Sequence, residues 1–217
     1  MIHRTRIKLC GLKRLEDVQH AVALGADAVG LVFYPGSPRY LTPPDAASLL
    51  AGLPPFVSAV GLFVNATTEQ VVDVVRQVPL SVLQFHGDES LEQCCLAAHA
   101  VNRPFVRAVR ITPGFDGADL LKCEQTYRAA SELFAGLLLD AATEGYGGGG
   151  KVFDWSVIPA ELAPRIILGG GLNPQNVAQA VSRLHPYAVD VSSGIEESRG
   201  VKDRARMSAF VEAARKA

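Results

Sequence analysis

The chain has 217 residues, of which 48% are hydrophobic and 20% are charged, and 21 basic against 22 acidic residues give a formal net charge of −1 at pH 7. This composition excludes collagen-like, low-complexity and wholly disordered chains, and the charge balance argues against nucleic acid or an anionic membrane as a partner. Four cysteines without a Cys-x-x-Cys pair, no apolar run of the ~20 residues that a membrane span needs and no signal-peptide core predict a reduced, cytoplasmic protein.

Eight short, apolar runs recur along the chain, and the segments between them have the spacing of amphipathic helices. The first such segment places Leu15, Val18 and Val22 on one face, and a later one begins at Thr67, whose side chain is a good N-cap. Asn173 and Pro174 predict the start of a further helix, with Asn173 as its cap. The predicted strands are residues 7–10, 28–33, 57–64, 82–85, 105–109, 137–139, 166–168 and 188–191.

The predicted strands are apolar throughout rather than alternating, which is typical of a parallel sheet that is buried on both faces. Eight such strands alternating with helices predict a single (β/α)8 TIM barrel with short loops that spans residues 1–217. The alternative is an open, doubly wound sheet of the flavodoxin or Rossmann kind, but no Gly-x-Gly-x-x-Gly follows the first strand. The glycine run at residues 147–150 lies inside one predicted loop and therefore indicates no domain boundary.

Two loops at the ends of the last predicted strands have the composition of an anion site. Residues 169–171 are three glycines that follow the seventh strand, and residues 192–194 are Ser-Ser-Gly after the eighth. Glycines allow a ligand to approach the backbone closely, and loops after strands 7 and 8 form the recurrent phosphate site of TIM barrels. We therefore predict a phosphate site here, although two turns and a helix cap are the simpler interpretation. Asp190, at the end of the eighth strand, either holds this loop pair or satisfies local amides.

Two residues at strand ends are candidates for proton transfer. Cys10 ends the first predicted strand, where a thiolate could act as a base, whereas a small core cysteine is the ordinary alternative. Asp140 ends the sixth, where a partly desolvated carboxyl group is suited to act as a general acid and a turn or cap is the alternative. Lys8 shares a strand face with Cys10, and if buried it would need an acidic partner. The glycine-rich loop 145–150 after Asp140 is predicted to be a lid.

Arg39 and His86 follow the second and fourth predicted strands. Two prolines stiffen the loop that carries Arg39, and a guanidinium group binds a carboxylate in a bidentate manner, although a solvated surface arginine is the alternative. His86 could titrate or donate a hydrogen bond to a ligand, whereas a histidine bonded to backbone is the ordinary interpretation.

The motifs at the strand ends occur in the order found in one enzyme family. They are Lys8-Leu9-Cys10-Gly11, Ser37-Pro38-Arg39, Gly61-Leu62-Phe63-Val64, Gln84-Phe85-His86-Gly87, Leu138-Leu139-Asp140, Gly148-Gly149-Gly150-Lys151-Val152-Phe153-Asp154-Trp155, Gly169-Gly170-Gly171-Leu172 and Asp190-Val191-Ser192-Ser193-Gly194-Ile195-Glu196. Each motif alone is weak, but the ordered set covers essentially the whole chain and closely resembles phosphoribosylanthranilate isomerase of tryptophan biosynthesis.

The resemblance implies an Amadori rearrangement of N-(5-phospho-β-D-ribosyl)anthranilate to 1-(2-carboxyphenylamino)-1-deoxy-D-ribulose 5-phosphate, without a metal or an organic cofactor. It also implies that Cys10 is the general base, that Asp140 is the general acid and that Arg39 contacts the anthranilate carboxylate. The remaining predicted substrate-binding residues are His86 and, at the phosphate, Gly170, Gly171, Ser192, Ser193 and Gly194.

Other barrels that bind sugar phosphates are less consistent with the strand ends. An indole-glycerol-phosphate synthase would need catalytic lysine and glutamate residues there, and a pentose-phosphate epimerase would need a metal-binding set of His and Asp residues, whereas His86 is the only histidine at a predicted strand end. A phosphate-binding barrel without catalytic turnover remains the alternative function, although Cys10 and Asp140 are both present. We expect a phosphorylated small molecule as the ligand, and a free-standing enzyme that is a monomer or a homodimer.

Overall fold

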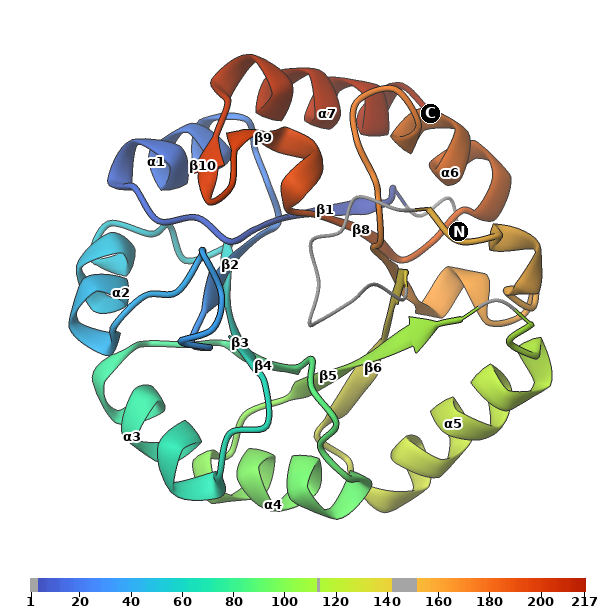
Figure 1. Ribbon diagram of the computed structural model, residues 1–217, viewed down its shortest axis with the longest axis horizontal. Coiled ribbons are helices and arrows are strands. Elements are labelled where there is room, and N and C mark those ends of the chain that lie inside the picture. The colour runs from blue at the N-terminus through green and yellow to red at the C-terminus, as the bar shows by residue number, and fades with distance from the viewer. Residues whose placement is uncertain (1–3, 113, 142–151) are drawn as a thin grey trace.

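The computed structural model describes residues 4–112, 114–141 and 152–217, and Figure 1 shows it along the axis of a closed ring of strands. Strands β1 to β8 pair in sequence order and β8 pairs with β1 in parallel, so the predicted (β/α)8 barrel is confirmed. The strands are β1 (Arg6–Cys10), β2 (Ala28–Val32), β3 (Ser58–Phe63), β4 (Val82–Phe85), β5 (Phe105–Ile111), β6 (Phe134–Ala141), β7 (Ile167–Leu168) and β8 (Ala188–Val191).

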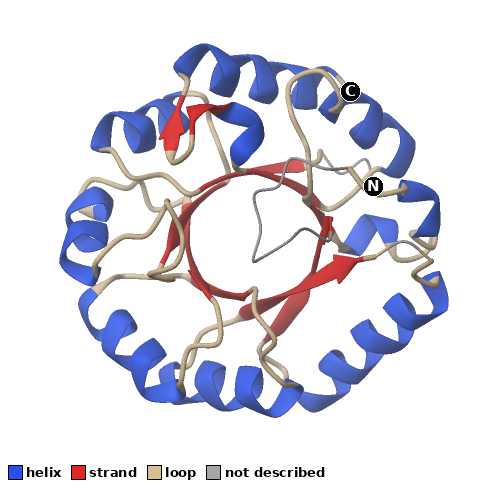
Figure 2. Cartoon of the chain, viewed as in Figure 1, coloured by secondary structure: helices blue, strands red, loops and turns tan. Residues whose placement is uncertain are grey.

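The helices surround this ring, as the blue elements of Figure 2 show. They are α1 (Leu15–Ala23), α2 (Pro43–Leu50), α3 (Thr68–Gln77), α4 (Leu91–Val101), α5 (Gly117–Ala130), α6 (Val177–Leu184) and α7 (Arg204–Lys216). Between β6 and β7 the described residues hold two 3-10 turns, η1 (Trp155–Val157) and η2 (Ala163–Arg165), where the other units have an α-helix. None of the helices in the described part of the chain combines the length and hydropathy of a membrane crossing.

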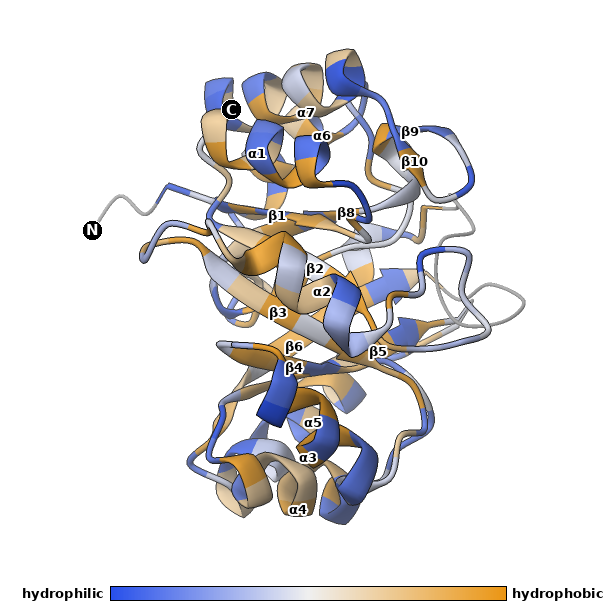
Figure 3. Ribbon diagram, turned by 90° about the vertical axis from the view of Figure 1, so that its left-hand side faces the viewer, coloured by the Kyte–Doolittle hydropathy of each residue, from blue (hydrophilic) through white to orange (hydrophobic). Residues whose placement is uncertain are grey.

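The strands alternate between an outer and an inner face. Ile7 and Leu9 of β1 belong to the large apolar core between strands and helices, whereas Lys8 and Cys10 have the opposite orientation. Figure 3 shows that the strands are mostly hydrophobic and that the surrounding helices carry both hydrophilic and hydrophobic residues. The inside of the ring therefore holds polar residues such as Lys8 together with a separate, smaller apolar cluster of Val106, Ala108 and Leu138.

A row of aromatic rings lies against the outer face of the strands. Phe33, Phe63, Phe85, Phe105 and Phe134 come from consecutive β-units, and neighbouring ring centroids lie 5.4, 6.3, 5.8 and 5.6 Å apart. These spacings are those of favourable ring pairs, so the row ties the region from β2 to β6 together.

Several details differ from the sequence-based expectation. The helix predicted at Asn173 begins only at Val177, because the Asn173 side chain accepts from the amides of Gln175 and Asn176 and thereby caps a separate turn. Strand β6 is also longer than predicted and begins at Phe134. In addition, a short antiparallel hairpin, β9 (Glu196–Ser198) and β10 (Val201–Lys202), follows β8; Figure 1 shows it between the ring and helices α1 and α7.

Candidate active site

Cys10 lies at the carboxyl end of β1, where it is buried and shares the inner strand face with Lys8. The Lys8 ammonium lies 2.8 Å from Asp190 Oδ1, and the two residues are register partners on the adjacent strands β1 and β8. Lys8 thus has the acidic partner that its burial requires, and the contact makes Asp190 the partner of Lys8.

The surroundings of Cys10 act on its thiol in opposite directions. Burial raises the pKa of Cys10 above the ordinary thiol value, and the positive charge of Lys8 opposes that shift without cancelling it. Burial likewise disfavours the charge of Lys8, but Asp190 and Cys10 outweigh it and raise the pKa of the ammonium. A proton that leaves Cys10 therefore leaves a thiolate beside a permanently charged lysine.

Space for the thiol depends on the neighbouring strand. Gly30 of β2 is the register partner of Cys10, and a Cβ atom at Gly30 would lie 2.6 Å from Cys10 Sγ. Gly11, with φ of +74°, has the same role on the other side, because a Cβ atom there would lie 2.4 Å from Arg39 Cδ and 3.1 Å from Ser192 Oγ. The two glycines allow Cys10, Arg39 and Ser192 to meet at the barrel mouth.

Asp140 is held by a chain of hydrogen bonds that connects it through His86 to Gln84 on β4. His86 Nε2 lies 3.0 Å from Asp140 Oδ2, and His86 Nδ1 lies 2.9 Å from Gln84 Nε2. Because the Gln84 amide nitrogen can only donate, Nδ1 accepts and the His86 hydrogen is on Nε2, where it is donated to Asp140. The second carboxylate oxygen accepts from the amide of Ala141 at 2.9 Å. His86 is thus bonded to side chains, not to backbone as its ordinary interpretation would have it.

Arg39 is buried and makes a two-point ion pair with Glu196, with 2.7 Å from Nε to Oε1 and 2.8 Å from Nη2 to Oε2. Glu196 Oε1 also accepts from Lys202 Nζ at 2.8 Å. The surface-arginine alternative is therefore wrong. Glu196 and Lys202 were assigned no role from the sequence, because neither residue type nor spacing indicates that a hairpin buries them beside Arg39.

The loops after β7 and β8, predicted as a joint phosphate site, contact one another. Gly194 lies so close to Leu172 that a Cβ atom would be 2.0 Å from its carbonyl oxygen. Gly170 and Gly171 have φ of +72° and +71°, a conformation that favours glycine, and a Cβ atom at Gly170 would lie 2.9 Å from Asp140 Oδ1. The triple glycine thus brings this loop up to the candidate acid.

Comparison with known proteins shows the family. The family model described as N-(5'-phosphoribosyl)anthranilate (PRA) isomerase matches residues 7–213. The chain belongs to this family. A relative from Herminiimonas arsenicoxydans, named N-(5'-phosphoribosyl)anthranilate isomerase, is 62% identical over 215 residues, which cover 99% of this chain and 95% of the relative.

Two solved structures share the barrel of this isomerase over nearly its whole length. One contains monomers generated from the dimeric phosphoribosylanthranilate isomerase of Thermotoga maritima; it is 38% identical with a TM-score of 0.82, and covers 98% of this chain and 100% of its own. The other is a phosphoribosylanthranilate isomerase in complex with reduced 1-(o-carboxyphenylamino)-1-deoxyribulose 5-phosphate; it is 39% identical, with the same TM-score and coverage.

The proposed lid, residues 145–150, lies outside the described residues. Among the residues that the structure describes, no group of three or more His, Cys, Asp and Glu side chains is arranged to hold a metal ion. That metal and cofactor are not needed stays a prediction.

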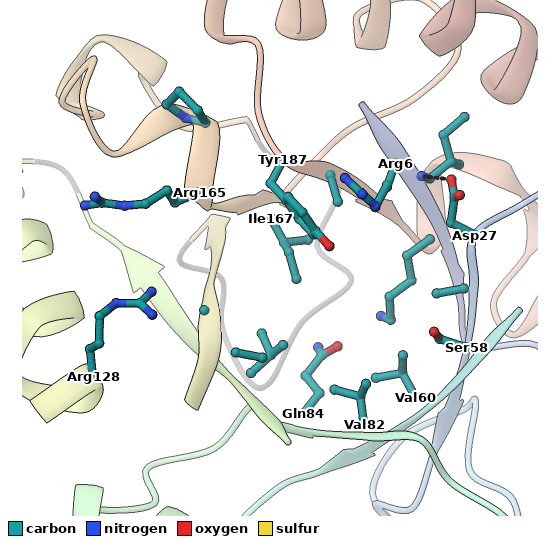
Figure 4. Close-up of a pocket in the computed structure, with 18 residues that line it drawn as sticks. Arg6, Asp27, Ser58, Val60, Val82, Gln84, Arg128, Arg165, Ile167 and Tyr187 are labelled. Carbon is teal, nitrogen blue, oxygen red and sulfur yellow. Dashed lines mark hydrogen bonds between the residues drawn. The ribbon is translucent and has the colours of Figure 1, made fainter. Parts of the chain in front are cut away.

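A cavity of about 370 Å³ lies at the other end of the isomerase barrel (Figure 4). Its lining includes Arg6, Ser58, Val82 and Tyr187, near the amino ends of the strands. Gln84 also lines it, so the chain of hydrogen bonds to Asp140 begins at the wall of this cavity. Since TIM-barrel enzymes bind substrate at the carboxyl ends of the strands, the cavity is on the side opposite the candidate active site.

Proposed function

We propose that this isomerase converts N-(5-phospho-β-D-ribosyl)anthranilate to 1-(2-carboxyphenylamino)-1-deoxy-D-ribulose 5-phosphate, with Cys10 as the base and Asp140 as the acid. The observation that carries the assignment is the position of the two groups. The thiol is on the last residue of β1 and the carboxyl group on the penultimate residue of β6, so they face one barrel mouth with β7 and β8 between them on one side. An acid and a base on separate strands can act on two positions of one sugar.

The rearrangement needs two such positions. Asp140 gives a proton to the furanose ring oxygen, the C1–O bond breaks and the existing nitrogen forms a Schiff base. Cys10 then removes the proton from C2 to give a neutral enolamine, which takes a proton at C1 and loses the proton of its C2 hydroxyl group to give the ketone. Each of these proton transfers, when made by a positioned side chain, contributes roughly 10²–10⁴-fold in rate. Hydrogen bonds from His86 and the Ala141 amide stabilise the carboxylate that remains after Asp140 has given its proton.

Arg39 is proposed to bind the anthranilate carboxylate. A guanidinium group has five N–H donors, and Glu196 occupies one on Nε and one on Nη2. The three that remain are one on Nη2 and two on Nη1, so the Nη1–Nη2 edge can make a second two-point contact. The ion pair with Glu196 therefore fixes the plane of the guanidinium group and leaves donors for a ligand.

The phosphate is proposed to bind at Gly170, Gly171, Ser192, Ser193 and Gly194. Contact between the loops after β7 and β8 supports a single site, since both backbones can then donate to one phosphate. Binding of the phosphate, which is remote from the reacting carbons, supplies energy that orients those carbons.

We infer a cytoplasmic enzyme that acts on a small phosphorylated substrate and not on nucleic acid. We also infer a monomer or a homodimer, since the relative from Thermotoga maritima is described both as dimeric and as monomers generated from that dimer.

The test is turnover of phosphoribosylanthranilate formed in situ, followed by the decay of its fluorescence with a metal chelator present. We expect fast decay with the wild type and at least a tenfold lower kcat with Cys10→Ala or Asp140→Asn. Cys123→Ala, which alters a cysteine on α5 away from the barrel mouth, is the matched control and should equal the wild type. No decay above the spontaneous rate in folded wild-type protein would favour a barrel that binds phosphate without turnover.

A further inference from the structure

We propose that Lys202 and Glu196, the two inward side chains of the β9–β10 hairpin, are positioning residues that set both ends of the substrate site. Lys202 orients the peptide between Ser192 and Ser193 at the phosphate end, and Glu196 orients Arg39 at the carboxylate end. The inference rests on the proposed function, since it takes from there where the phosphate and the carboxylate bind.

Lys202 is fixed by three contacts. Its side chain is fully buried, and Nζ donates to Ser192 O at 3.0 Å, to Ser192 Oγ at 3.3 Å and to Glu196 Oε1 at 2.8 Å. An ammonium group has three N–H donors, so the three contacts account for all of them. All three donors of this buried lysine are therefore used by protein acceptors, and none is left for solvent. Two of the three contacts go to Ser192, the first residue of the predicted phosphate loop.

The contact with the Ser192 carbonyl determines where the next amide points. The peptide bond is planar and trans, so the C=O of Ser192 and the N–H of Ser193 point in opposite directions. Lys202 holds the carbonyl, and the N–H of Ser193 is thereby directed away from the hairpin. In the described part of the structure, neither this N–H nor that of Gly194 donates to a protein acceptor. These two donors are therefore available for a phosphate oxygen.

Glu196 connects this end to the other. It accepts from both Nε and Nη2 of Arg39 and from Lys202, so one carboxylate lies between two cations. The three side chains, all buried, have a combined charge of +1. The neighbouring pair of Lys8 and Asp190 is neutral as a pair, so the excess positive charge at this part of the barrel mouth comes from the hairpin cluster. The negative charge of an anionic substrate compensates this excess positive charge.

The hairpin itself is anchored, so it can act as a rigid frame. Arg14 donates to the Lys202 carbonyl at 2.7 Å, and the Asp203 amide donates to Ile195 O at 2.9 Å. Gly200, with φ of +81°, forms the turn, and a Cβ atom there would lie 2.7 Å from the carbonyl oxygen of Pro38, the residue before Arg39. The turn therefore packs directly against the loop that carries Arg39.

The experiment measures binding of two fragments, inorganic phosphate and anthranilate, to the wild type and variants by calorimetric titration. Because these measurements need no turnover, they are independent of whether the proposed reaction occurs. Lys202→Met should raise the Kd for phosphate at least tenfold, and Glu196→Gln should raise the Kd for anthranilate by a similar factor. KM should rise accordingly while kcat changes less, since both contacts are made in ground and transition state alike.

The matched control is Glu124→Gln. Glu124 is also a buried glutamate between two arginines, Arg128 and Arg165, but it lies on α5 and contacts no residue of the candidate site. It should lower Tm and leave both Kd values unchanged. Lys202→Arg keeps the charge and should recover part of the phosphate affinity; if Lys202→Met does not fold, Lys202→Arg should still bind phosphate more weakly than the wild type. If the hairpin variants lower Tm and leave both Kd values unchanged, as is expected of Glu124→Gln, the inference is overturned. If the wild type binds both fragments but does not turn over phosphoribosylanthranilate, the result counts against the proposed reaction alone.

Discussion

His86 donates its Nε2 hydrogen to Asp140 Oδ2 over 3.0 Å, although His86 directly follows β4 and Asp140 lies on β6, and β5 separates these two strands in the barrel. The sequence predicted His86 as a substrate contact, whereas this bond makes it a partner of the candidate acid. These two roles have different kinetic consequences.

We expect His86→Ala to lower kcat by about 10–100-fold with little change in KM, since a hydrogen bond to a charged group contributes roughly 1.5–3 kcal/mol. His99→Ala is the control, because that histidine lies on α4 with Ser131 as its partner. Steady-state kinetics decide the matter: a rise in KM at constant kcat would return His86 to the role of a substrate contact.

The rate should depend on pH through Cys10. Burial raises the pKa of its thiol above the ordinary value of about 8.5, so at neutral pH most of the free enzyme has the protonated, inactive base. We expect kcat/KM to rise between pH 7 and pH 9 and the residual activity of Cys10→Ala to lack this rise. A profile of the wild type that is already level at pH 7 would show that the base has a lower pKa than its surroundings imply.

Gly30→Ala tests the placement of the thiol without removing it. The added Cβ atom would lie 2.6 Å from Cys10 Sγ, so the thiol must move. Because a displacement of about 1 Å in an active site can cost about 10²-fold, we expect kcat to fall at least tenfold. Gly52→Ala adds the same atom where no other atom lies within 4 Å and should leave activity unchanged. Equal kcat in both variants would mean that Cys10 needs no fixed position.

Stability should fall in acid partly through Glu196. Burial alone would raise the pKa of Glu196, but the hydrogen bond from Arg39 and the charge of Lys202 outweigh it and lower the pKa. The folded protein therefore binds this proton less readily than the unfolded chain. Its contribution is complete above the unfolded value of about 4.3 and is lost as the pH falls through the lower folded value.

Melting curves between pH 7 and pH 3 measure this loss. Glu196→Gln should start from a lower Tm at pH 7 and decline less steeply below pH 4.3 than the wild type, while Glu161→Gln, at an exposed position, should follow the wild type. Parallel curves for the wild type and Glu196→Gln would remove Glu196 from the acid response.

The sequence was a good guide to what each strand places at its carboxyl end. Cys10, Asp140 and the glycines after β7 could be found because the barrel topology fixes which positions follow a strand. It was a poor guide to pairs between distant elements. Arg39 and Glu196 are 157 positions apart, and nothing in the spacing of either indicates that β9 and β10 bury one against the other. Asn173 misled for a local reason, since its side chain caps a turn instead of the helix.

The row of phenylalanines joins strands that are consecutive in the sequence, whereas the contact of Lys8 with Asp190 joins positions 182 apart. Local contacts form quickly and distant ones wait for a long segment of chain to close, so we expect the arc from β2 to β6 to assemble first and β1 to meet β8 last. The thiol on β1 has Lys8 on its own strand, but it gains Asp190 and Lys202 as neighbours only when the ring shuts. Partly assembled chains would lack the base's electrostatic environment, and catalysis would begin only with the finished ring.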